Sequence, residues 1–141
     1  MATEPIVLFS CGRVAAMAGV SLRQLQHWDE QHVLKPVQKT TRQRLYSERN
    51  ALEACLLAEL RTRGMSFQRC RRVLPAVRRH LNTGVDLTGL EILLVTDGHT
   101  VRFGGAPAVV EMLTAARGGL YVISVSDAAK RIEAEKEMAK R

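Results

Sequence analysis

Apolar residues recur at helical spacing twice within the first 30 residues of the chain. The first pattern follows Ser10 and stops at Gly19, and the second follows Ser21, whose side chain can cap a helix that begins at Leu22. Two short helices joined by a glycine-containing turn are the skeleton of a helix-turn-helix. The apolar positions expected to face the core of this motif are Val14, Met17, Ala18, Leu22, Leu25 and Trp28.

Polar side chains occupy the other side of the second predicted helix. Arginine can bind guanine through two hydrogen bonds, glutamine can do the same for adenine, and histidine can donate to a phosphate. Any exposed amphipathic helix also has a polar face, so a merely solvated face is the alternative interpretation. The candidates for DNA contacts on this helix and at its start are Ser21, Arg23, Gln24, Gln26 and His27, with Glu30 on the same side.

The segment from Lys35 to Tyr46 is basic, and no acidic residue follows it before Glu48. Pro36 lies at its start, and the segment can form a loop or a small hairpin. Leu45 and Tyr46 are the apolar residues at its base. We interpret it as a wing whose cations contact the phosphate backbone beside the second helix. A solvated connecting loop is the alternative. The candidate residues of the wing are Lys39, Arg42, Arg44 and Tyr46.

Two longer amphipathic helices are predicted after the wing. Ser47 caps the first, which ends at Gly64, and Ser66 starts the second, which Pro75 kinks or interrupts. This second helix is expected to end near residues 82–84. The residues expected to face inward are Leu52, Leu56, Leu57, Leu60, Phe67, Cys70, Val73 and Leu74.

The pattern changes to short β-like runs after Gly84. Two of them flank an Asp97-Gly98 pair, which is a strong signal of a hairpin turn. The predicted elements are strands over 92–96 and 100–103, a helix over about 108–117, a strand over 120–125, and a terminal helix to about 139 that is capped by Ser126.

Together these patterns predict an α+β fold. Residues 1–84 are expected to form a mainly helical winged helix-turn-helix, and residues 85–141 a small ββαβα unit. So short a unit has little core of its own, and we expect it to pack against the first part of the chain or against a second copy.

Charge divides the chain at the same place. The net charge of the sequence is +7; residues 1–84 carry 14 Lys or Arg and 6 Asp or Glu, and residues 85–141 carry 7 and 8. A concentrated positive charge is typical of a protein that binds a polyanion, because each neutralised phosphate releases condensed counterion. An ordinary solvated surface is the alternative. No apolar run approaches the roughly 20 residues that span a bilayer, so a cytoplasmic protein is expected.

Candidate chemistry is sparse along the chain. No pairing of nucleophile and base, no paired carboxylates and no metal-ligand spacing stands out, so no catalytic, cofactor-binding or metal-binding residue is predicted and an enzyme is the least favoured class. Asp97 and His99 are explained by the hairpin turn. Cys11, Cys55 and Cys70 match neither a disulfide framework nor a zinc motif. The last two are expected to be buried thiols, with redox or metal sensing as the alternative.

Several motifs occur in the order and spacing of a known family. The GVS turn, the RQLQHWD helix, LKP, RLYS and RTRGMS all fall between about Phe9 and Leu74. This part of the chain resembles the N-terminal DNA-binding domain of the MerR family. The resemblance implies a winged helix-turn-helix whose second helix enters the major groove. It places Arg23 in the base-contacting helix, Trp28 at an aromatic position of that helix, and Arg44 with Tyr46 in the wing.

The chain departs from the family pattern in a few places. His27 stands where a tyrosine is usual and His32 where a glycine is usual, and the wing lacks the common Asn-Gly turn. These departures concern the local phosphate contacts and the shape of the wing, and leave the fold intact. The long helix through which such proteins usually dimerise, as an antiparallel coiled coil, is also missing.

These observations lead us to expect a homodimeric transcription regulator that reads an inverted repeat in double-stranded DNA. The unit at residues 85–141 would then serve dimerisation, or would bind an effector or a partner protein. One alternative is an antitoxin-like or accessory protein whose C-terminal unit binds a partner protein. Another is an architectural or recombination-directionality factor of the excisionase type. No cofactor is expected.

Overall fold

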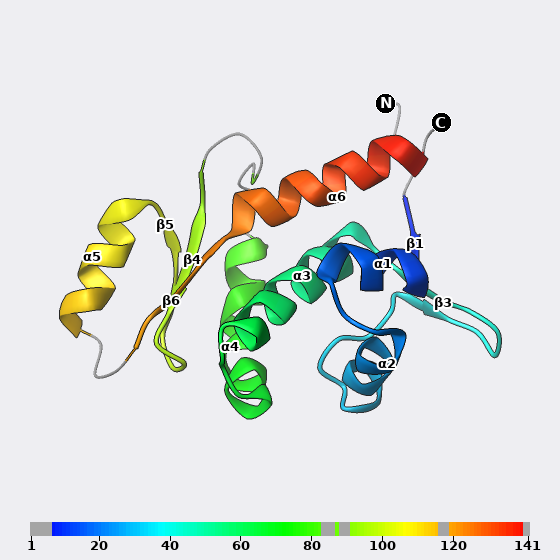
Figure 1. Cartoon of the computed structure of the whole chain (residues 1–141), viewed down its shortest axis with the longest axis horizontal. Coiled ribbons are helices and arrows are strands. Elements are labelled where there is room, and N and C mark those ends of the chain that lie inside the picture. The colour runs from blue at the N-terminus through cyan, green and yellow to red at the C-terminus, as the bar shows by residue number, and fades with distance from the viewer. Residues whose placement is uncertain (1–6, 83–86, 88–90, 116–118, 140–141) are drawn as a thin grey trace. The chain divides into compact units, whose positions relative to one another are not determined.

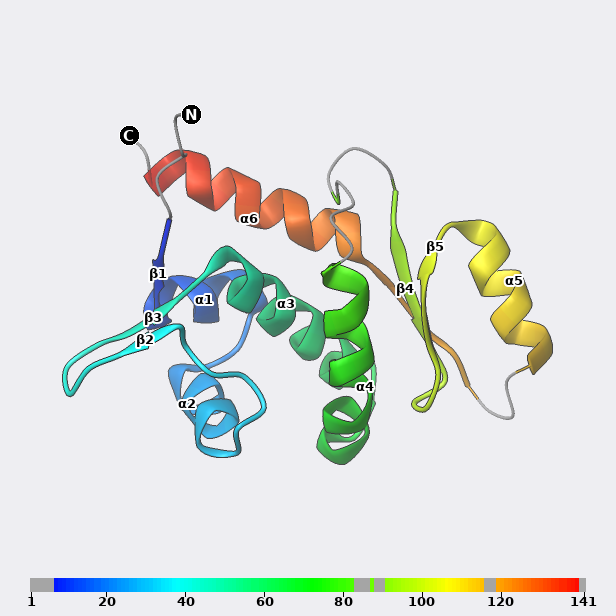
Figure 2. The ribbon, with the colours of Figure 1, turned by 180° about the vertical axis from the view of Figure 1, so that it is seen from behind.

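A computed structural model describes residues 7–82, 87, 91–115 and 119–139. The chain divides into two units, of which unit 1 comprises residues 1–55 and 131–141, and unit 2 residues 56–130. Two helices, α3 (Glu48–Thr62) and α6 (Val125–Ala139), each contribute residues to both units. Figures 1 and 2 show the elements from opposite sides.

Unit 1 contains the predicted helix-turn-helix and wing. Its first helices are α1 (Cys11–Ala18) and α2 (Leu22–Glu30), and its strands are β1 (Phe9–Ser10), β2 (Gln38–Lys39) and β3 (Arg44–Tyr46). The three strands form an antiparallel sheet in the order β1-β3-β2, with Phe9 opposite Tyr46 and Gln38 opposite Leu45. The loop or hairpin expected before Tyr46 is therefore a hairpin.

Local capping explains where α1 and α2 begin and end. The Ser10 side chain accepts a hydrogen bond from Arg13 N, and Gly19 ends α1 in the left-handed conformation with a φ of 71°. Ser21 and Gln24 form a reciprocal capping box, in which Gln24 N donates to Ser21 Oγ (3.0 Å) and Ser21 N donates to Gln24 Oε1 (3.3 Å). Both predicted helix starts are confirmed.

One residue of the predicted core is misplaced. Leu25 and Trp28 are buried as expected, but Leu22 is 57% exposed. Leu22 is the first residue of α2, and there the helix has no preceding turn to enclose it. The expectation that Leu22 faces the core is wrong.

The two longer helices also follow the expected caps. The hydroxyl of Ser47 accepts from Asn50 N (3.1 Å) at the start of α3, and the hydroxyl of Ser66 accepts from Arg69 N (3.2 Å) at the start of α4 (Phe67–Leu81). Between the helices, Gly64 has a φ of 100°. The leucines predicted to face inward from α3, each at most 6% exposed, are Leu52, Leu56, Leu57 and Leu60.

Pro75 lies inside α4 and does not interrupt it. The proline removes one hydrogen-bond donor from the helix. Its ring lies on the exposed side, whereas one apolar stripe stays buried along the whole helix and holds both halves in place. That stripe consists of Cys70, Val73, Leu74, Val77 and Leu81.

Unit 2 contains the predicted ββαβα arrangement up to the start of its last helix. Strands β4 (Leu93–Thr96), β5 (Val101–Gly104) and β6 (Tyr121–Ser124) form an antiparallel sheet in the order β5-β4-β6, and α5 (Ala106–Ala115) connects β5 to β6. The predicted α+β class is confirmed. The predicted end of α5 at Arg117 lies outside the described residues.

The predicted hairpin turn is held by Asp97. Its Oδ1 accepts from His99 N (2.8 Å) and Thr100 N (2.7 Å), and Gly98 has a φ of 95°. The Thr100 and His99 amides lower the pKa of the Asp97 carboxyl below its usual value, because they favour the ionised form. Asp97 and Gly98 therefore have the structural roles assigned to them.

The cap of α6 differs from the expectation. β6 ends at Ser124, whose hydroxyl accepts from Asp127 N (3.1 Å), so Ser124 takes the place predicted for Ser126. The Ser126 side chain is buried and accepts from Ile92 N (2.6 Å). The helix begins two residues earlier than predicted, at Val125, and Ser126 thereby turns toward the sheet.

The final turns of α6 lie against α1 and α3 within unit 1. Arg131 donates to the carbonyl oxygen of Met17 (3.0 Å), and Glu135 pairs with Arg13 at 2.7 Å. Lys136 lies 3.1 Å from a carboxylate oxygen of Glu48. Unit 1 is thus built from two parts of the sequence, one from the N-terminal and one from the C-terminal region. The predicted domains, residues 1–84 and 85–141, do not coincide with these two units. Gly84 lies outside the described residues. The division at Gly84 therefore stays a prediction.

We expect the packing of α6 to stabilise the protein. Ile132 is 4% exposed, and Ile132→Ala should lower the free energy of unfolding by about 2–4 kcal/mol, because it removes buried methyl groups and leaves a cavity. Urea denaturation would measure the change. Met138→Ala, on the same helix but 59% exposed, should change it by less than about 0.5 kcal/mol. Equal effects would show that α6 is not packed at Ile132.

Candidate nucleic-acid interface

The outward side of α2 is as polar and exposed as the sequence predicts. Arg23, Gln26, His27 and Glu30 are all exposed. No described residue lies within hydrogen-bond or ion-pair distance of the Arg23 side chain. Gln26 Nε2 donates to Glu30 Oε1 at 3.1 Å, one turn further along the helix. Arg23 is therefore the cation that this helix presents to solvent.

Two of the predicted contact residues also hold the helix start. Ser21 and Gln24 are exposed, yet their side chains bond to each other's backbone amides in the capping box. Their side-chain oxygens are therefore occupied as acceptors. This arrangement favours a positioning role for them, although a DNA contact stays a prediction.

A buried carboxylate, which the sequence analysis missed, joins α2 to the wing. The side chain of Asp29 is only 5% exposed, and its Oδ2 accepts from both Lys39 Nζ and Arg44 Nε, each at 2.9 Å. Lys39 comes from β2 and Arg44 from β3, so both strands of the wing are tied to the helix. The sequence contains one signal of this contact. Asp29 follows Trp28 on the inner side of α2, and the wing segment that comes after it contains basic but no acidic residues.

The pairing with Asp29 changes how the wing cations are used. The Lys39 side chain is 53% exposed and that of Arg44 is 28% exposed. Nε of Arg44 bonds to Asp29, which leaves the two terminal nitrogens as further donors. Both residues are therefore partly structural, and their phosphate contacts stay predictions.

A threonine closes the tip of the wing in place of an Asn-Gly pair. Thr40 N donates to Gln43 O (2.8 Å), and Thr40 Oγ1 accepts from Gln43 N (3.0 Å). Arg42 lies between them and is exposed. Among the predicted wing residues, Arg42 is the cation at the tip.

Tyr46 lies in the core of unit 1. It is fully buried, and its hydroxyl has no hydrogen-bond partner among the described residues. Burial raises the pKa of Tyr46, and the nearby Cys11 and Asp29 add to the shift. Burial favours a packing role over a DNA contact, which remains untested.

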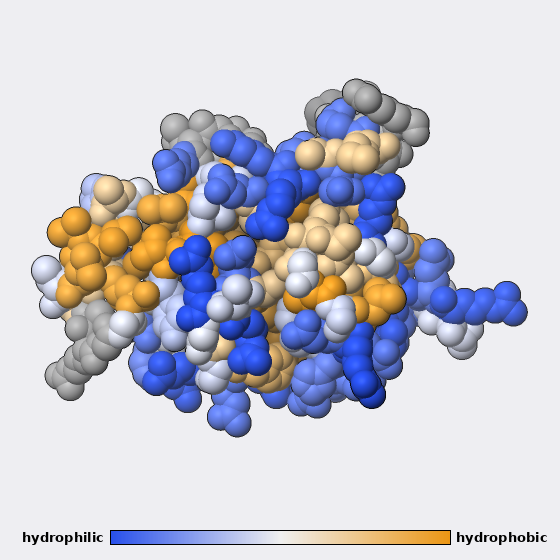
Figure 3. Space-filling view, in the orientation of Figure 1, coloured by the Kyte–Doolittle hydropathy of each residue, from blue (hydrophilic) through white to orange (hydrophobic). Residues whose placement is uncertain are grey.

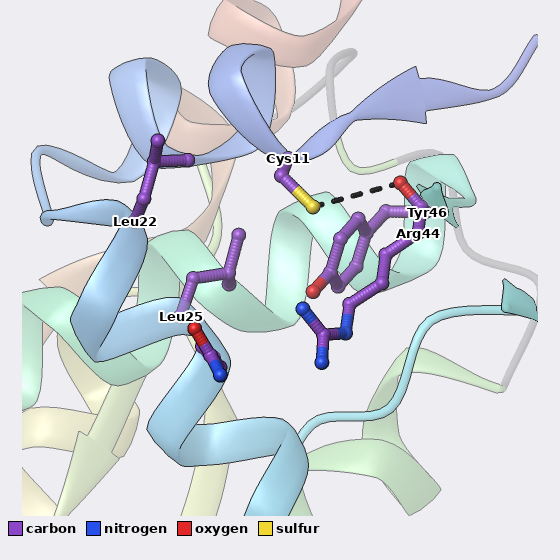
Figure 4. A pocket seen from close by; sticks show the side chains of 6 residues that line it. Cys11, Leu22, Leu25, Arg44 and Tyr46 are labelled. Atoms are coloured by element: carbon purple, nitrogen blue, oxygen red, sulfur yellow. Dashed lines mark hydrogen bonds between the residues drawn. The ribbon is translucent and has the colours of Figure 1, made fainter. Parts of the chain in front are cut away.

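A hollow of about 210 Å³ opens beside Tyr46, between α1, α2 and the wing (Figure 4). Cys11 Sγ donates to the carbonyl oxygen of Arg44 at 3.6 Å across this region and so links α1 to β3. The lining residues are Cys11, Leu22, Leu25, Gln26, Arg44 and Tyr46.

The other two cysteines are core residues. Cys55 and Cys70 are both buried, as the sequence predicts. Burial raises the pKa of the Cys70 thiol to about 11, which keeps it protonated at neutral pH. Among the described residues, no group of three or more His, Cys, Asp or Glu side chains is placed to hold a metal ion.

An exposed polar helix after a tight turn, braced to an antiparallel hairpin, defines a winged helix-turn-helix, a class of DNA-binding domain. Residues 9–77 match the family described as MerR HTH family regulatory protein, and this match supports a MerR-family helix-turn-helix region in the N-terminal part of the chain. The resemblance inferred from the sequence is confirmed. A search of curated proteins found no match. Within the described residues, no helix is long and apolar enough to cross a membrane.

We expect Asp29 to stabilise unit 1. Asp29→Asn should lower the free energy of unfolding by about 1–3 kcal/mol, because Lys39 and Arg44 lose their ion pairs and keep at most weaker hydrogen bonds to an uncharged amide oxygen. Chemical denaturation would measure this change. Glu30→Gln neutralises the exposed neighbouring carboxylate and should cost less than about 0.5 kcal/mol. If the two variants were equally stable, Asp29 would not brace the wing.

Proposed function

We propose that this protein is a sequence-specific transcription regulator that binds double-stranded DNA. A MerR-family helix-turn-helix region is typical of DNA-binding transcription regulators. The observation that carries the proposal is the exposed face of α2, with Arg23 facing solvent on a helix fixed to the wing by Asp29. Proteins of this family are generally not enzymes, and we assign no catalytic role to any residue.

The contacts divide by chemistry between α2 and the wing. α2 enters the major groove, where Arg23 and Gln26 read base edges. His27 contacts phosphate from the same helix, and Arg42 does so from the wing tip. Arg44 and Lys39 add phosphate contacts through the donors that Asp29 leaves available. Base contacts set the sequence preference, and phosphate contacts set register and affinity.

Two copies of the chain act together on an inverted repeat in this proposal. One recognition helix reads few base pairs, so two-fold pairing raises specificity. An apolar face on α5 supports the pairing, because Val110 and Leu113 are 60% and 63% exposed while Met112 packs inward. Figure 3 shows this apolar surface over α5. Glu111, the one charged residue of α5, pairs with Arg102, so little charge opposes the approach of a second copy.

Selecting bound duplexes from a random pool would test the function, and Arg23→Ala would test the reading helix. The variant should bind the selected site about 1–3 kcal/mol more weakly and bind random duplex almost unchanged, because a base contact is lost. Fluorescence anisotropy on both duplexes measures this difference. Equal losses on the two duplexes would remove Arg23 from base reading, and a pool without a shared sequence would overturn the proposed function.

The dimer can be tested on α5. Leu113→Glu places a carboxylate on the exposed apolar face, so the variant should sediment as a monomer and bind an inverted repeat no better than a single half-site. Ala115→Glu adds the same charge at an exposed position about 160° around the helix from Leu113, outside the apolar face, and should stay dimeric. A native chain that is already monomeric would favour the alternative of an accessory protein whose C-terminal unit binds another protein.

A further inference from the structure

The hollow beside Tyr46 has the size of a small organic molecule. Its side chains come from α1, α2 and β3, all within unit 1 (Figure 4). An apolar cavity of about 150 Å³ holds one molecule of benzene. The volume of this hollow is about 210 Å³, so it has room for a molecule slightly larger than benzene.

The Tyr46 hydroxyl is a buried donor with no acceptor. Tyr46 is fully buried, and its hydroxyl has no hydrogen-bond partner among the described residues. Cys11, which lies close by, donates its thiol hydrogen to the carbonyl oxygen of Arg44. In Figure 4 the Tyr46 side chain points from β3 toward α2, into the space that these residues line. A ligand that accepts a hydrogen bond there would remove the cost of burying an unpaired hydroxyl.

Tyr46 keeps its proton at neutral pH. Burial raises the pKa of its hydroxyl, and the nearby Cys11 and Asp29 add to the shift. The group is therefore a hydrogen-bond donor throughout the ordinary pH range, and it favours a ligand whose polar end is an acceptor.

The charge beside this hydroxyl favours a ligand with a single negative charge. Arg44 and Lys39 both pair with Asp29, so two positive charges face one negative charge. Only Nε of Arg44 bonds to Asp29, which leaves its two terminal nitrogens as donors beside the hollow. One carboxylate balances the remaining charge and matches the two parallel donors of a guanidinium group.

The opposite wall of the hollow is apolar. Leu25 is buried there, whereas Leu22 is 57% exposed although it belongs to the same apolar side of α2. An apolar ligand body in the hollow would cover the Leu22 side chain, and removal of such surface from water is favourable. Donors on one side and leucines on the other define a site for an amphipathic molecule.

We propose that this hollow binds a small amphipathic carboxylate, whose charged group bonds to Arg44 and Tyr46 while its hydrocarbon part covers Leu22 and Leu25. The bond to the covered hydroxyl forms as the neighbouring Arg44 side chain shifts toward the ligand. A bound carboxylate takes the donors with which Arg44 would contact phosphate, so the ligand and DNA compete. This competition rests on the proposed function, and it is reciprocal, because each partner lowers the affinity for the other by the same factor.

Calorimetry on the full-length chain at constant ionic strength tests the site, with benzoate as the probe. Benzamide, a neutral molecule of the same shape, should bind at least tenfold more weakly. Tyr46→Phe should weaken benzoate binding about tenfold, because a hydrogen bond to a charged group is lost. Its melting temperature should not fall, because the hydroxyl that it removes has no partner. Tyr121→Phe removes the same group outside the hollow and should bind benzoate like the native chain.

The apolar wall provides a second, independent variant. Leu22→Ala should weaken benzoate binding several-fold, because the ligand loses part of the surface that it covers. Val37→Ala is the matched control, since Val37 is 53% exposed and does not line the hollow. Both side chains are exposed, so neither variant should unfold the protein.

Binding of a random-sequence duplex measures the competition. At about 0.1 M salt, saturating benzoate should lower the affinity about eightfold and reduce the log-log salt slope by about 0.9, as expected for one lost phosphate contact. Benzamide at the same concentration should leave both quantities unchanged. In Tyr46→Phe, about ten times more benzoate should be needed for the same effect.

Several results would overturn the proposal. The site is excluded if benzoate does not bind, if benzamide binds equally well, or if the losses in Tyr46→Phe and Leu22→Ala equal those of their controls. Unchanged DNA affinity with benzoate bound would exclude the competition. A native chain that binds benzoate and no duplex keeps the site and removes the proposed function. A chain that binds its selected duplex and no benzoate keeps the proposed function and removes the site.

Discussion

The geometry of the proposed reading surface depends on one buried carboxylate. Asp29 accepts hydrogen bonds from Lys39 and Arg44, one on each strand of the wing, and thereby fixes the hairpin to α2. The bonds join charged groups, and Asp29 itself is shielded from water, so they are stronger than surface ion pairs. Without Asp29, the distance between the wing and α2 would be set only by the backbone of residues 31–37 and by the contacts of β3 with β1 and Cys11. Phosphate contacts by the wing can set the register of α2 only while that distance is constant.

The element that we propose to read sequence is not the element that carries most of the excess positive charge. α2 and the wing bear mixed charges, while α4 concentrates arginines that no described carboxylate on the same unit neutralises at Arg71 and Arg79. Such a separation has a physical advantage. Counterion release at a surface that carries charge alone would raise affinity for every duplex equally, and so would leave unaffected the discrimination that we propose for Arg23 and Gln26. The β4–β5 hairpin lies against α4, where the His80 ring stacks on Phe103, and so gives the C-terminal part of the chain a role in positioning that charge.

Helix α6 also joins the C-terminal part of the described chain to α1. α6 contributes its last residues to unit 1, where Arg131 bonds to Met17 O and Glu135 pairs with Arg13. In this chain α6 follows a sheet and packs beside α1 and α3. The family usually has a long dimerisation helix after the DNA-binding domain instead. A fragment ending at Gly84 would lack these contacts, so the helix-turn-helix is completed by residues from beyond the predicted domain boundary. The dimer that we propose would then use another surface, the exposed apolar side of α5.

The sequence by itself determined the local elements of this protein. Caps at Ser10, Ser21 and Ser66 and the Asp97-Gly98 turn act over three or four residues, so spacing alone reveals them. Only the tertiary structure decided which charges pair and which faces stay open. Asp29 and Arg44 are 15 residues apart, and Arg131 and Met17 are 114 apart. No periodicity marks such pairs, because they form only when separate elements pack. For the same reason the exposure of Leu22, the buried hydroxyl of Ser126 and the arginine face of α4 emerged from the fold.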